Sequence, residues 1–327
     1  MKPQLSICVP TYNRSGCLKE CLDSIMVSVS GYESQIEIIV SDNDSIDDTI
    51  DIIRSFQIKY SWIRYYRNDS NIGGEENFYR LFTLATGDYV WLIGDDDKLA
   101  QEAISIVMNS IDRGGGKHNL LVCDYSKHSK NFKEKKAEFG HGFNTVSTIT
   151  NHNDLMKMFG WRLGYISSVI FKRPIFLSST KQRYEKYYEY GFSFLYMIYH
   201  GVINDCSALY INKPLVCNRM DNSIIHDSWK YFVAGISIIL NDLKNEGYSA
   251  QSINRTKNKM IFYYVIPHIV SLKIKGDLTI HKWRELFYNY RKCLNFWFFC
   301  VPILLMPSFC LRQVKKIKHT VIRLKNV

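Results

Sequence analysis

The sequence lacks the cysteine spacing that builds metal sites or disulfide frameworks. Its nine cysteines are scattered along 327 residues, with no Cys-x-x-Cys pair and no cluster of cysteine and histidine spaced for zinc. Some of them, such as Cys8, fall in apolar runs, where a free cysteine acts as a small hydrophobic side chain. This pattern argues against a structural zinc protein or a disulfide-rich protein and favours a reducing compartment.

Targeting and membrane-spanning signals are also missing. The N-terminal residues MKPQLSICVPTYNR enter an apolar strand at once, without the apolar core or cleavage site of a signal peptide. The uncharged segment 296–311 (FWFFCVPILLMPSFCL) has 16 residues and two prolines, which is short for a spanning helix. We expect it to lie in the membrane interface as a monotopic anchor; the alternative is a helical hairpin in the core of a folded domain.

Acidic residues are outnumbered, because 42 lysines and arginines face 31 aspartates and glutamates and give a net charge of +11. The excess is uneven: residues 33–51 are acidic, whereas the C-terminal stretch is basic. The basic side chains of that stretch are Lys315, Lys316, Lys318, Arg323 and Lys325. Clustered positive charge indicates an anionic partner. No motif of a nucleic-acid-binding module is present, so we expect an anionic membrane surface and no nucleic acid.

Strand and helix patterns alternate over the N-terminal part of the chain. Short apolar runs and helically spaced apolar residues in this order are typical of a parallel, doubly wound α/β sheet. The expected strands are 5–10, 36–41, 62–66 and 89–93, followed by 165–171 and 208–212. Ligands of such sheets bind beyond the carboxyl ends of the strands, where the loops 10–14, 42–48 and 94–97 are expected.

The pattern changes after about residue 228, where it becomes helical throughout. We therefore expect a catalytic domain over 1–227 and a helical, membrane-associating region over 228–327. Within the first region we expect Asp47 to cap the second helix, a polar loop over the site at 126–150, and a helix over 189–200.

Three adjacent carboxylates follow the fourth expected strand, in the run Gly94-Asp95-Asp96-Asp97. They repel one another, and a divalent cation would relieve that repulsion because hard cations bind carboxylate oxygens and bridge to phosphates. A solvated turn is the alternative. The position of the run at the end of a strand favours the metal site.

Four motifs carry a family resemblance. VPTYNR at 9–14, VSDNDSIDDT at 40–49, NIGG at 71–74 and ATGDYVWLIGDDD at 85–97 stand in the order and spacing of family 2 glycosyltransferases. The chain is most similar to the O-antigen abequosyltransferase type within that family. The resemblance implies the GT-A fold, a Rossmann-like, mostly parallel sheet flanked by helices, here with a helical C-terminal extension.

The resemblance also implies roles for individual residues. Those expected to bind the nucleotide are Pro10, Thr11, Tyr12, Arg14, Asp42, Asn71 and Asp95. Asp96, with help from Asp95, is the expected ligand of Mg²⁺ or Mn²⁺, and Asp97 is expected to orient the donor sugar or to cap the next helix. Two departures stand out: Gly94 replaces the first aspartate of the family's Asp-x-Asp motif, and Phe78 stands where many members have a phosphate-facing arginine, with Asn77 and Arg80 nearby.

The catalytic base is expected at Glu189, counted back from Gly201 as the family's Glu-Asp pair, with Glu185 and Asp205 as competitors. The alternative for Glu189 is a cap on the following helix. In the segment CNRMDNSIIHD, Arg219, Asp221 and His226 would fold over the donor phosphates or lie on the surface.

Together these features predict an inverting glycosyltransferase. It would move a sugar from a nucleoside-diphosphate sugar to a lipid-linked (polyprenyl diphosphate) oligosaccharide in bacterial O-antigen or surface polysaccharide synthesis. It would be peripheral, at the cytoplasmic face of the inner membrane. One alternative is a sugar-nucleotide nucleotidyltransferase, which needs a Gly-rich basic loop that VPTYNRSGC does not supply. The other is a non-catalytic nucleotide-binding scaffold of a polysaccharide assembly complex.

Overall fold

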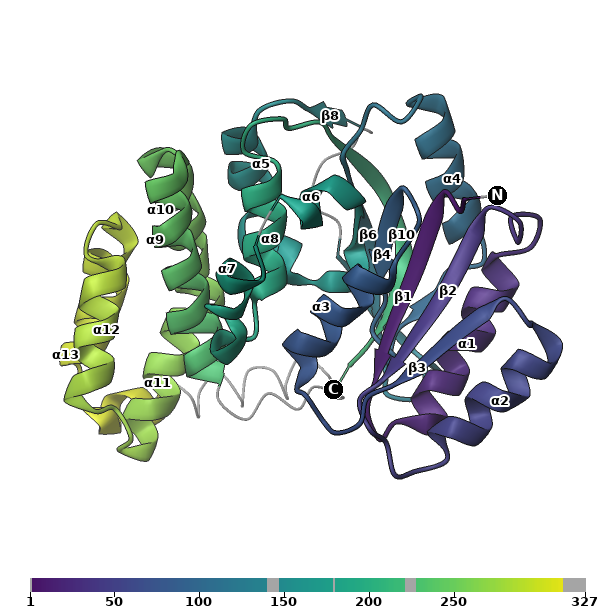
Figure 1. Cartoon of the computed structure of the whole chain (residues 1–327). Helices are drawn as coiled ribbons and strands as arrows, with labels where there is room; N and C mark the ends of the chain where they lie inside the picture. Colours follow the sequence, from purple (N-terminus) through teal and green to yellow (C-terminus); the bar gives the residue numbers. More distant parts are fainter. Residues whose placement is uncertain (1, 140–146, 179, 221–227, 314–327) are drawn as a thin grey trace. The chain divides into compact units, whose positions relative to one another are not determined.

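The computed structural model describes residues 2–139, 147–178, 180–220 and 228–313. Its internal contacts divide the chain into two compact units, Met1–Ile225 and His226–Val327. The first unit is an α/β fold and the second is helical (Figure 1).

One sheet of ten strands forms the centre of the first unit. Along its main path the order is β3-β2-β1-β4-β9-β6-β10-β5, with β7 paired to β6 and β8 to β10. The strands are β1 (Leu5–Thr11), β2 (Ile36–Asp42), β3 (Ile63–Arg67), β4 (Tyr89–Leu92), β5 (Lys98–Leu99), β6 (Leu120–His128), β7 (Lys135–Phe139), β8 (Ser147–Ile149), β9 (Val169–Lys172) and β10 (Ala208–Arg219).

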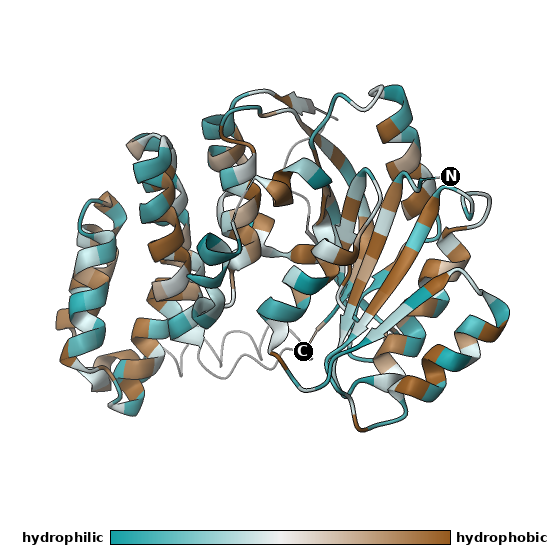
Figure 2. Cartoon of the chain, viewed as in Figure 1, coloured by the Kyte–Doolittle hydropathy of each residue, from teal (hydrophilic) through white to brown (hydrophobic). Residues whose placement is uncertain are grey.

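Most pairings on the main path are parallel. β1 runs parallel to β2 and β4, β2 to β3, and β6 to β10, whereas β9 is antiparallel to both of its neighbours. Strands buried on both faces are expected to be continuously apolar. β4 (YVWL) meets this expectation with four buried residues, and the central strands are mostly brown in Figure 2. The predicted GT-A-like α/β class is therefore confirmed.

The longer helices of this unit pack through an apolar stripe. In α1, Leu18, Leu22 and Ile25 recur at helical spacing and are fully buried, and each such side chain contributes roughly 1.5–3 kcal/mol. The helical elements of this unit are α1 (Ser15–Ser28), α2 (Thr49–Lys59), α3 (Gly74–Leu84), α4 (Ala103–Arg113), α5 (His152–Phe159), η1 (Gly160–Gly164), η2 (Ile166–Ser168), α6 (Arg173–Leu177), α7 (Lys181–Glu185), η3 (Tyr188–Tyr190) and α8 (Ser193–Gly201).

The predicted cap at Asp47 is wrong by one residue, because α2 begins after Asp48. The Asp47 carboxylate instead accepts hydrogen bonds from the backbone N–H groups of Ser15 at 2.8 Å and Thr49 at 3.2 Å. It therefore joins the starts of α1 and α2, and so holds the two loops that precede these helices together.

Two other local predictions need correction. The segment 126–150 was expected to be a loop, but β6 continues to His128 and both β7 and β8 join the sheet. The polar composition of β7 hid a strand that is exposed over its described side chains. The helix expected over 189–200 is interrupted, because Gly191 takes a left-handed conformation with φ 66° between η3 and α8.

The second unit is helical over all its described residues except for short connections, as predicted. Its elements are η4 (Trp229–Gly235), α9 (Ile236–Glu246), α10 (Ala250–Met260), η5 (Ile261–Val265), α11 (Ile266–Lys275), α12 (Ile280–Tyr290), η6 (Phe296–Cys300) and α13 (Val301–Leu305), with η4, η5 and η6 as π-helical turns. Among the described residues, no helix combines the length and the hydropathy that crossing a bilayer requires.

The uncharged segment 296–311 has two faces. Phe296, Cys300 and Leu304 are buried in the core of the helical unit. The opposite side chains stay exposed, and they are Trp297, Phe298, Phe299, Leu305 and Phe309. The segment thus belongs to the folded core on one side and presents large apolar side chains to its surroundings on the other.

Candidate active site

The motif loops meet in one pocket at the carboxyl end of β1. The pocket has a volume of about 440 Å³, within the usual range for small-molecule sites. Its lining residues are Pro10, Thr11, Tyr12, Arg14, Asn43, Asn71, Gly73, Gly74, Asn77, Phe78, Gly94, Asp95, Asp96 and Ile166. Seven of the predicted site residues thus lie together, because the parallel strands β1, β2 and β4 end at the same edge of the sheet.

Two carboxylates of the acidic run share one cation in this pocket. Arg14 Nη1 lies 3.1 Å from Asp95 Oδ1 and 3.1 Å from Asp96 Oδ2. Thr11 Oγ1 donates a hydrogen bond to Asp95 Oδ2 at 2.8 Å. Burial, reinforced by Asp96 and opposed by Arg14, raises the pKa of Asp95 to about 6. The pocket therefore balances its own carboxylates with a guanidinium.

Asp97 lies outside the residues that line the pocket and is 3% exposed. Its Oδ2 accepts hydrogen bonds from Tyr165 and Ser167, each at 2.7 Å, and its Oδ1 accepts one from Asn218 at 3.1 Å. Burial and the neighbouring Asp96 raise the pKa of Asp97 to about 7. It does not cap a helix, because β5 follows it in the chain.

Asp42 is fully buried behind the pocket rather than in its lining. Its Oδ1 accepts the backbone N–H of Ser45 at 2.9 Å, and its Oδ2 accepts the Tyr65 hydroxyl at 2.7 Å. The next residue, Asn43, reaches the lining instead. Its amide donates to Asn71 Oδ1 at 2.7 Å, which ties the loop after β2 to the NIGG turn.

The lining contains residues that the sequence did not single out as nucleotide ligands. One of them is Asn43. Two others, Gly73 and Gly74, belong to the quoted NIGG motif, and Gly73 has a φ of 84°. Asn77 was noted near the diphosphate position; it is buried and donates to the Ser41 carbonyl at 3.0 Å, so it anchors the start of α3. Ile166 lies in η2, far along the chain from the other lining residues, and no motif pointed to it.

Phe78 lines the pocket at the position where the family resemblance led us to look for an arginine. Arg80 is not in the lining. Arg14 is the cationic side chain among the described residues that line the pocket.

Glu189, the expected base, is exposed on η3 and is not part of the pocket lining. Of its competitors, Glu185 is exposed and pairs with Lys181 at 3.5 Å. Asp205 lies just before β10, at the amino end of that strand and thus at the opposite edge of the sheet from the pocket.

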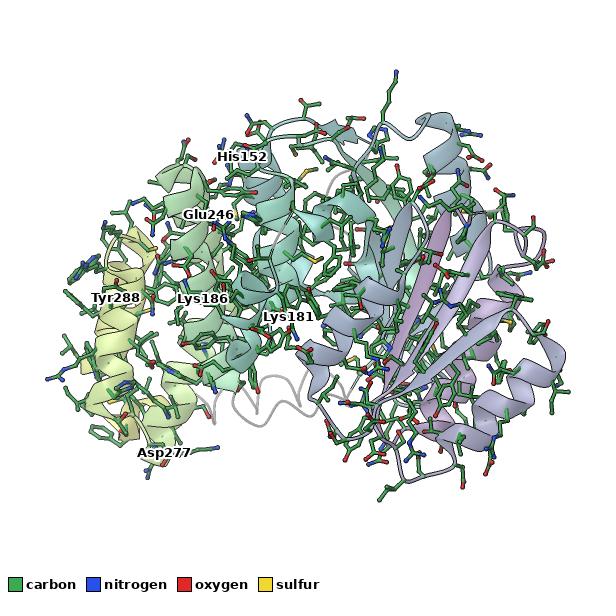
Figure 3. All side chains as sticks on the ribbon, in the orientation of Figure 1. His152, Lys181, Lys186, Glu246, Asp277 and Tyr288 are labelled. Atoms are coloured by element: carbon green, nitrogen blue, oxygen red, sulfur yellow. The ribbon has the colours of Figure 1, made fainter. Side chains whose placement is uncertain are left out.

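Two further glutamates at the start of α3 had no signal in the sequence analysis. Ser193 Oγ donates to the Glu75 carboxylate, and burial raises the pKa of Glu75 to about 7. Glu76 accepts the Tyr188 hydroxyl at 2.7 Å and pairs with Lys181 (labelled in Figure 3) at 2.8 Å. Together they tie the pocket wall to the segment that carries Glu189.

The carboxylates suit a hard divalent cation. No group of three or more His, Cys, Asp or Glu side chains gathers for a metal within the described part of the chain. Mg²⁺, however, is commonly held by one or two carboxylates together with substrate phosphates, and Asp95 and Asp96 line the pocket side by side. Their donor chemistry therefore fits Mg²⁺ or Mn²⁺ brought in with a nucleotide.

Arg219 braces the acidic loop from β10. Its Nε donates to the Asp96 carbonyl at 3.1 Å, its Nη2 pairs with Glu20 at 2.8 Å, and its guanidinium stacks 4.4 Å from the Phe132 ring centre. With 8% exposure it is a positioning residue for the loop. The predicted partners Asp221 and His226 lie outside the described residues.

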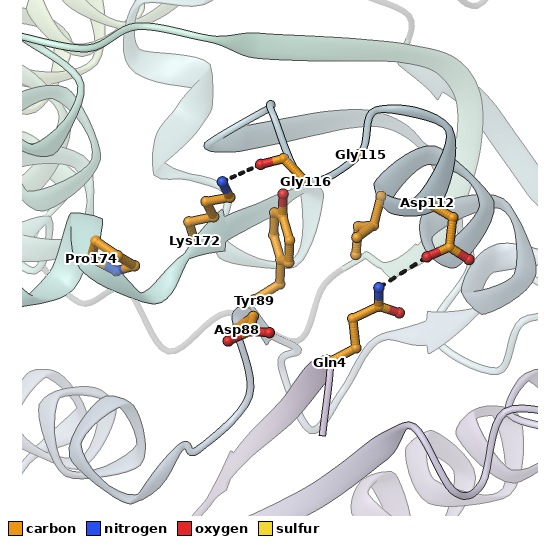
Figure 4. Close-up of a pocket in the computed structure, with 9 residues that line it drawn as sticks. Gln4, Asp88, Tyr89, Asp112, Gly115, Gly116, Lys172 and Pro174 are labelled. Carbon is orange, nitrogen blue, oxygen red and sulfur yellow. Dashed lines mark hydrogen bonds between the residues drawn. The ribbon is translucent and has the colours of Figure 1, made fainter. Parts of the chain in front are cut away.

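A second cavity lies at the opposite, amino-terminal edge of the sheet (Figure 4). Its lining includes Gln4 before β1 and Asp88 before β4, with Asp112 and Lys172 close by. None of the predicted site residues lines this cavity. The seven predicted site residues that line a pocket therefore all lie at the carboxyl edge of the sheet.

Comparisons with known proteins agree with this geometry. The family model for glycosyl transferase family 2 matches residues 6–175. The chain is 31% identical over 231 residues to abequosyltransferase RfbV of Salmonella typhimurium, covering 67% of each chain. It is 32% identical over 187 residues to a GalNAc(5)-diNAcBac-PP-undecaprenol beta-1,3-glucosyltransferase of Campylobacter jejuni, covering 57% of this chain and 56% of that one. The S. aureus TarS 1–349 structure superposes with a TM-score of 0.63 at 14% identity, covering 88% of this chain and 79% of that one, which shows the shared fold.

Proposed function

Because the chain belongs to glycosyl transferase family 2, we propose that it moves one sugar from a nucleoside-diphosphate sugar to a lipid-linked oligosaccharide in bacterial O-antigen or surface polysaccharide synthesis. The relatives support this proposal: one is named an abequosyltransferase, and another acts on a glycan carried by undecaprenol. We further propose that transfer inverts the anomeric centre in a single displacement.

One observation carries the proposal, namely the joint presence of Arg14, Asp95 and Asp96 in a pocket that the four motif loops build. Carboxylates that hold a metal with a diphosphate, and a guanidinium that contacts it, are what the departure of a nucleoside diphosphate requires. Tyr12 and Asn71 flank the same space, where a base and a ribose would lie.

The chain's own residues prepare this chemistry. Asp96, with Asp95 beside it, would hold a divalent cation, which as a Lewis acid stabilises negative charge on the leaving diphosphate. Arg14 would contact the diphosphate once a ligand competes for its carboxylate partners. Asp42 and Asn43 would hold the loop that contacts the base and ribose, and Asp97 would fix the loop that faces the donor sugar.

We assign the general base to Glu189, which would take the proton of the acceptor hydroxyl as that oxygen attacks. Glu189 is exposed, and the segment that carries it is joined to α3 by the hydrogen bond from Tyr188 to Glu76. Glu75 is the alternative carboxylate, since a pKa near 7 suits proton transfer at neutral pH.

We also propose that the protein is peripheral at the cytoplasmic face of the inner membrane, held by residues 296–325. Support comes from the exposed aromatic side of 296–311, in which Phe298 is 71% and Phe309 67% exposed. Large apolar side chains of this kind partition into the interface, and nearby lysines attract anionic lipid.

A ligand screen tests the proposed activity. Thermal unfolding of the full chain is measured with each nucleoside diphosphate and triphosphate, with and without Mn²⁺. A glycosyltransferase is stabilised by one diphosphate, more strongly with Mn²⁺, and then releases that diphosphate from the matching sugar donor. Stabilisation by triphosphates alone would instead indicate a nucleotidyltransferase, and binding without turnover of any donor a scaffold.

A further inference from the structure

The helical unit contains a basic pocket of about 230 Å³ that plays no part in the function argued above. Its lining residues are Asn241, Lys244, Asn245, Ala250, Ile253, Asn254, Lys257, Tyr288, Asn289, Arg291 and Lys292. The lining thus combines four cationic side chains with four asparagines and contains no carboxylate. A liquid water molecule takes about 30 Å³, so the space admits a group much larger than one water.

Lys257 lies at the centre of this arrangement and is only 3% exposed. Its ammonium donates to Asn241 Oδ1 at 2.8 Å and to the Asn289 carbonyl at 2.9 Å. Both acceptors are neutral. Asn241 is itself held in place by a hydrogen bond from its amide to Asn289 Oδ1 at 3.1 Å, so the site is preformed.

The described residues provide no carboxylate partner for this buried charge. Within the described residues, Lys244, Lys257 and Lys292 have no carboxylate within 4.0 Å. Burial, together with repulsion from Lys244 and Lys292 and against the influence of Cys293, lowers the pKa of Lys257 to about 8. A buried charge without a partner is costly, and an incoming anion would remove that cost.

A purely structural role for Lys257 does not explain the other cations of the pocket. Lys257 could serve only as a donor that caps the Asn289 carbonyl, but that role requires neither of the two exposed lysines placed beside it. Like charges converging on one space repel, and the fold has to hold them there. An anionic ligand accounts for all of the cations at once.

The rim of the pocket joins an exposed aromatic surface. Tyr288, labelled on α12 in Figure 3, lines the pocket and is 68% exposed. The Arg291 guanidinium lies 5.6 Å from the Tyr288 ring centre and 5.7 Å from that of Phe287. Phe287 in turn contacts Trp297 at 6.0 Å between ring centres. An apolar chain attached to an anion in the pocket could therefore pack against these aromatic rings.

We propose that this pocket binds the phosphate of a membrane amphiphile, either the headgroup of an anionic phospholipid or the diphosphate of a polyprenyl-linked glycan. Lys257 contacts the phosphate from inside, Lys244 and Lys292 from the rim, and the asparagine amides complete the donor set. The second source rests on the proposed function, whereas the phosphate site itself does not.

Calorimetric titration of the full chain with inorganic pyrophosphate, in a chelator that removes divalent ions, tests the site. Lys257→Met should weaken binding at least tenfold, and Lys244→Gln should weaken it several-fold. Lys275→Gln removes an exposed lysine of the same unit outside the pocket and should change nothing. Arg14→Met, in the α/β unit, should also leave this binding intact. If Arg14→Met abolishes pyrophosphate binding and Lys257→Met does not, the proposal is overturned.

If Lys257→Met does not fold, a second variant still tests the site. Lys244→Gln/Lys292→Gln changes two exposed residues and should weaken binding at least tenfold; unchanged binding would refute the site.

The pH dependence of pyrophosphate binding gives another readout. The titratable and charged groups around Lys257 are Lys244, Lys292 and Cys293, the Tyr290 ring at 5.7 Å, and Tyr288 and Arg291 in the pocket lining. Since the protonated ammonium binds the anion, the affinity of the wild type should fall as the pH rises above about 8.

Vesicle sedimentation distinguishes the two sources. Wild type and Lys244→Gln/Lys292→Gln are compared on phosphatidylcholine vesicles that contain either phosphatidylglycerol or a polyprenyl diphosphate. A difference between the proteins on phosphatidylglycerol alone identifies a phospholipid headgroup, and a difference on polyprenyl diphosphate alone identifies the acceptor. If the two proteins sediment equally on both kinds of vesicle, the proposal that the pocket binds a membrane amphiphile is overturned. A failure of nucleotide binding would count against the proposed function and leave this site untouched.

Discussion

The two units hold their charges in opposite ways. In the α/β unit, Asp95 and Asp96 share the Arg14 guanidinium, so the pocket is electrostatically compensated before a ligand arrives. In the helical unit, Lys257 is buried against neutral acceptors and has two further lysines beside it. The compensated pocket suits a ligand that brings its own cation, such as a metal nucleotide. The uncompensated pocket suits a bare anion.

The two pockets should also respond differently when a ligand binds. Under the proposed function, Arg14 would exchange its carboxylate partners for a diphosphate, and a cation that arrives with the nucleotide would replace it at Asp95 and Asp96. Lys257 has no charged partner to exchange. Ligand binding should therefore rearrange the first pocket and mainly fill the second.

Removal of one carboxylate from the compensated pocket should have the largest effect. Asp96→Asn should abolish sugar transfer and weaken nucleotide binding in Mn²⁺, because an amide removes one anionic ligand and one of the two carboxylates that pair with Arg14. Turnover of the donor identified in the ligand screen, followed with and without EDTA, measures the loss.

The matched control is Asp88→Asn, which removes an exposed carboxylate that pairs with Lys2 at the opposite edge of the sheet. It should leave both properties unchanged. Full activity of Asp96→Asn, or full activity of the wild type in excess EDTA, would break the comparison, since a cation would then play no part in the compensated pocket.

A smaller effect is expected at the proposed base. Glu189→Gln keeps the size of the side chain but cannot accept a proton, so turnover should fall about a hundredfold while nucleotide affinity stays constant. Steady-state turnover and nucleotide titration separate these two quantities.

Glu185→Gln, an exposed neighbour on α7, serves as the control and should keep its turnover. Should Glu189→Gln remain active while Glu75→Gln is inactive, the base lies on α3. The proton would then go to the half-buried carboxylate that Ser193 contacts, and the assignment made by counting from Gly201 would be wrong.

The sequence predicted β1, β2, β3, β4, β9 and the start of β10 because these strands carry strong local patterns, but it missed β6 (Leu120–His128). β1, β2 and β4 are short apolar runs followed by polar loops, and parallel pairing brings those loops to one edge. β7 escaped prediction because it is polar and exposed, and the break at Gly191 escaped because one left-handed residue leaves the apolar spacing of α8 unchanged.

The candidate site was predictable only where motifs mark it. Arg14, Asp95 and Asp96 stand in quoted motifs, and the fold brings them together. Ile166 and Glu75 have no such signal, because their place in or beside the pocket depends on how η2 and α8 pack. In the sequence Lys257 is one of 42 lysines and arginines, and only its burial distinguishes it.

The smallest predicted effect concerns the exposed aromatic side of the helical unit. Phe298→Ser/Phe309→Ser should lower the fraction of protein that sediments with anionic vesicles about tenfold. Each phenylalanine contributes roughly 1.5–3 kcal/mol when fully removed from water, and partial insertion retains part of that. The basic residues should preserve a weaker attachment that salt releases, because charge attraction to lipid is screened by ions.

These two substitutions sharpen the comparison between the units because they leave both pockets intact. Neither phenylalanine is in the buried core, so the variant should unfold at the same temperature and bind nucleotide and pyrophosphate as the wild type does. Val27→Ser/Ile58→Ser removes two exposed apolar side chains from the α/β unit, 58% and 86% exposed, and should sediment as fully as the wild type. Equal sedimentation of all three proteins would show that the aromatic side does not meet the membrane. Attachment would then depend on charge alone, with Lys257 and its neighbouring lysines as the next residues to vary.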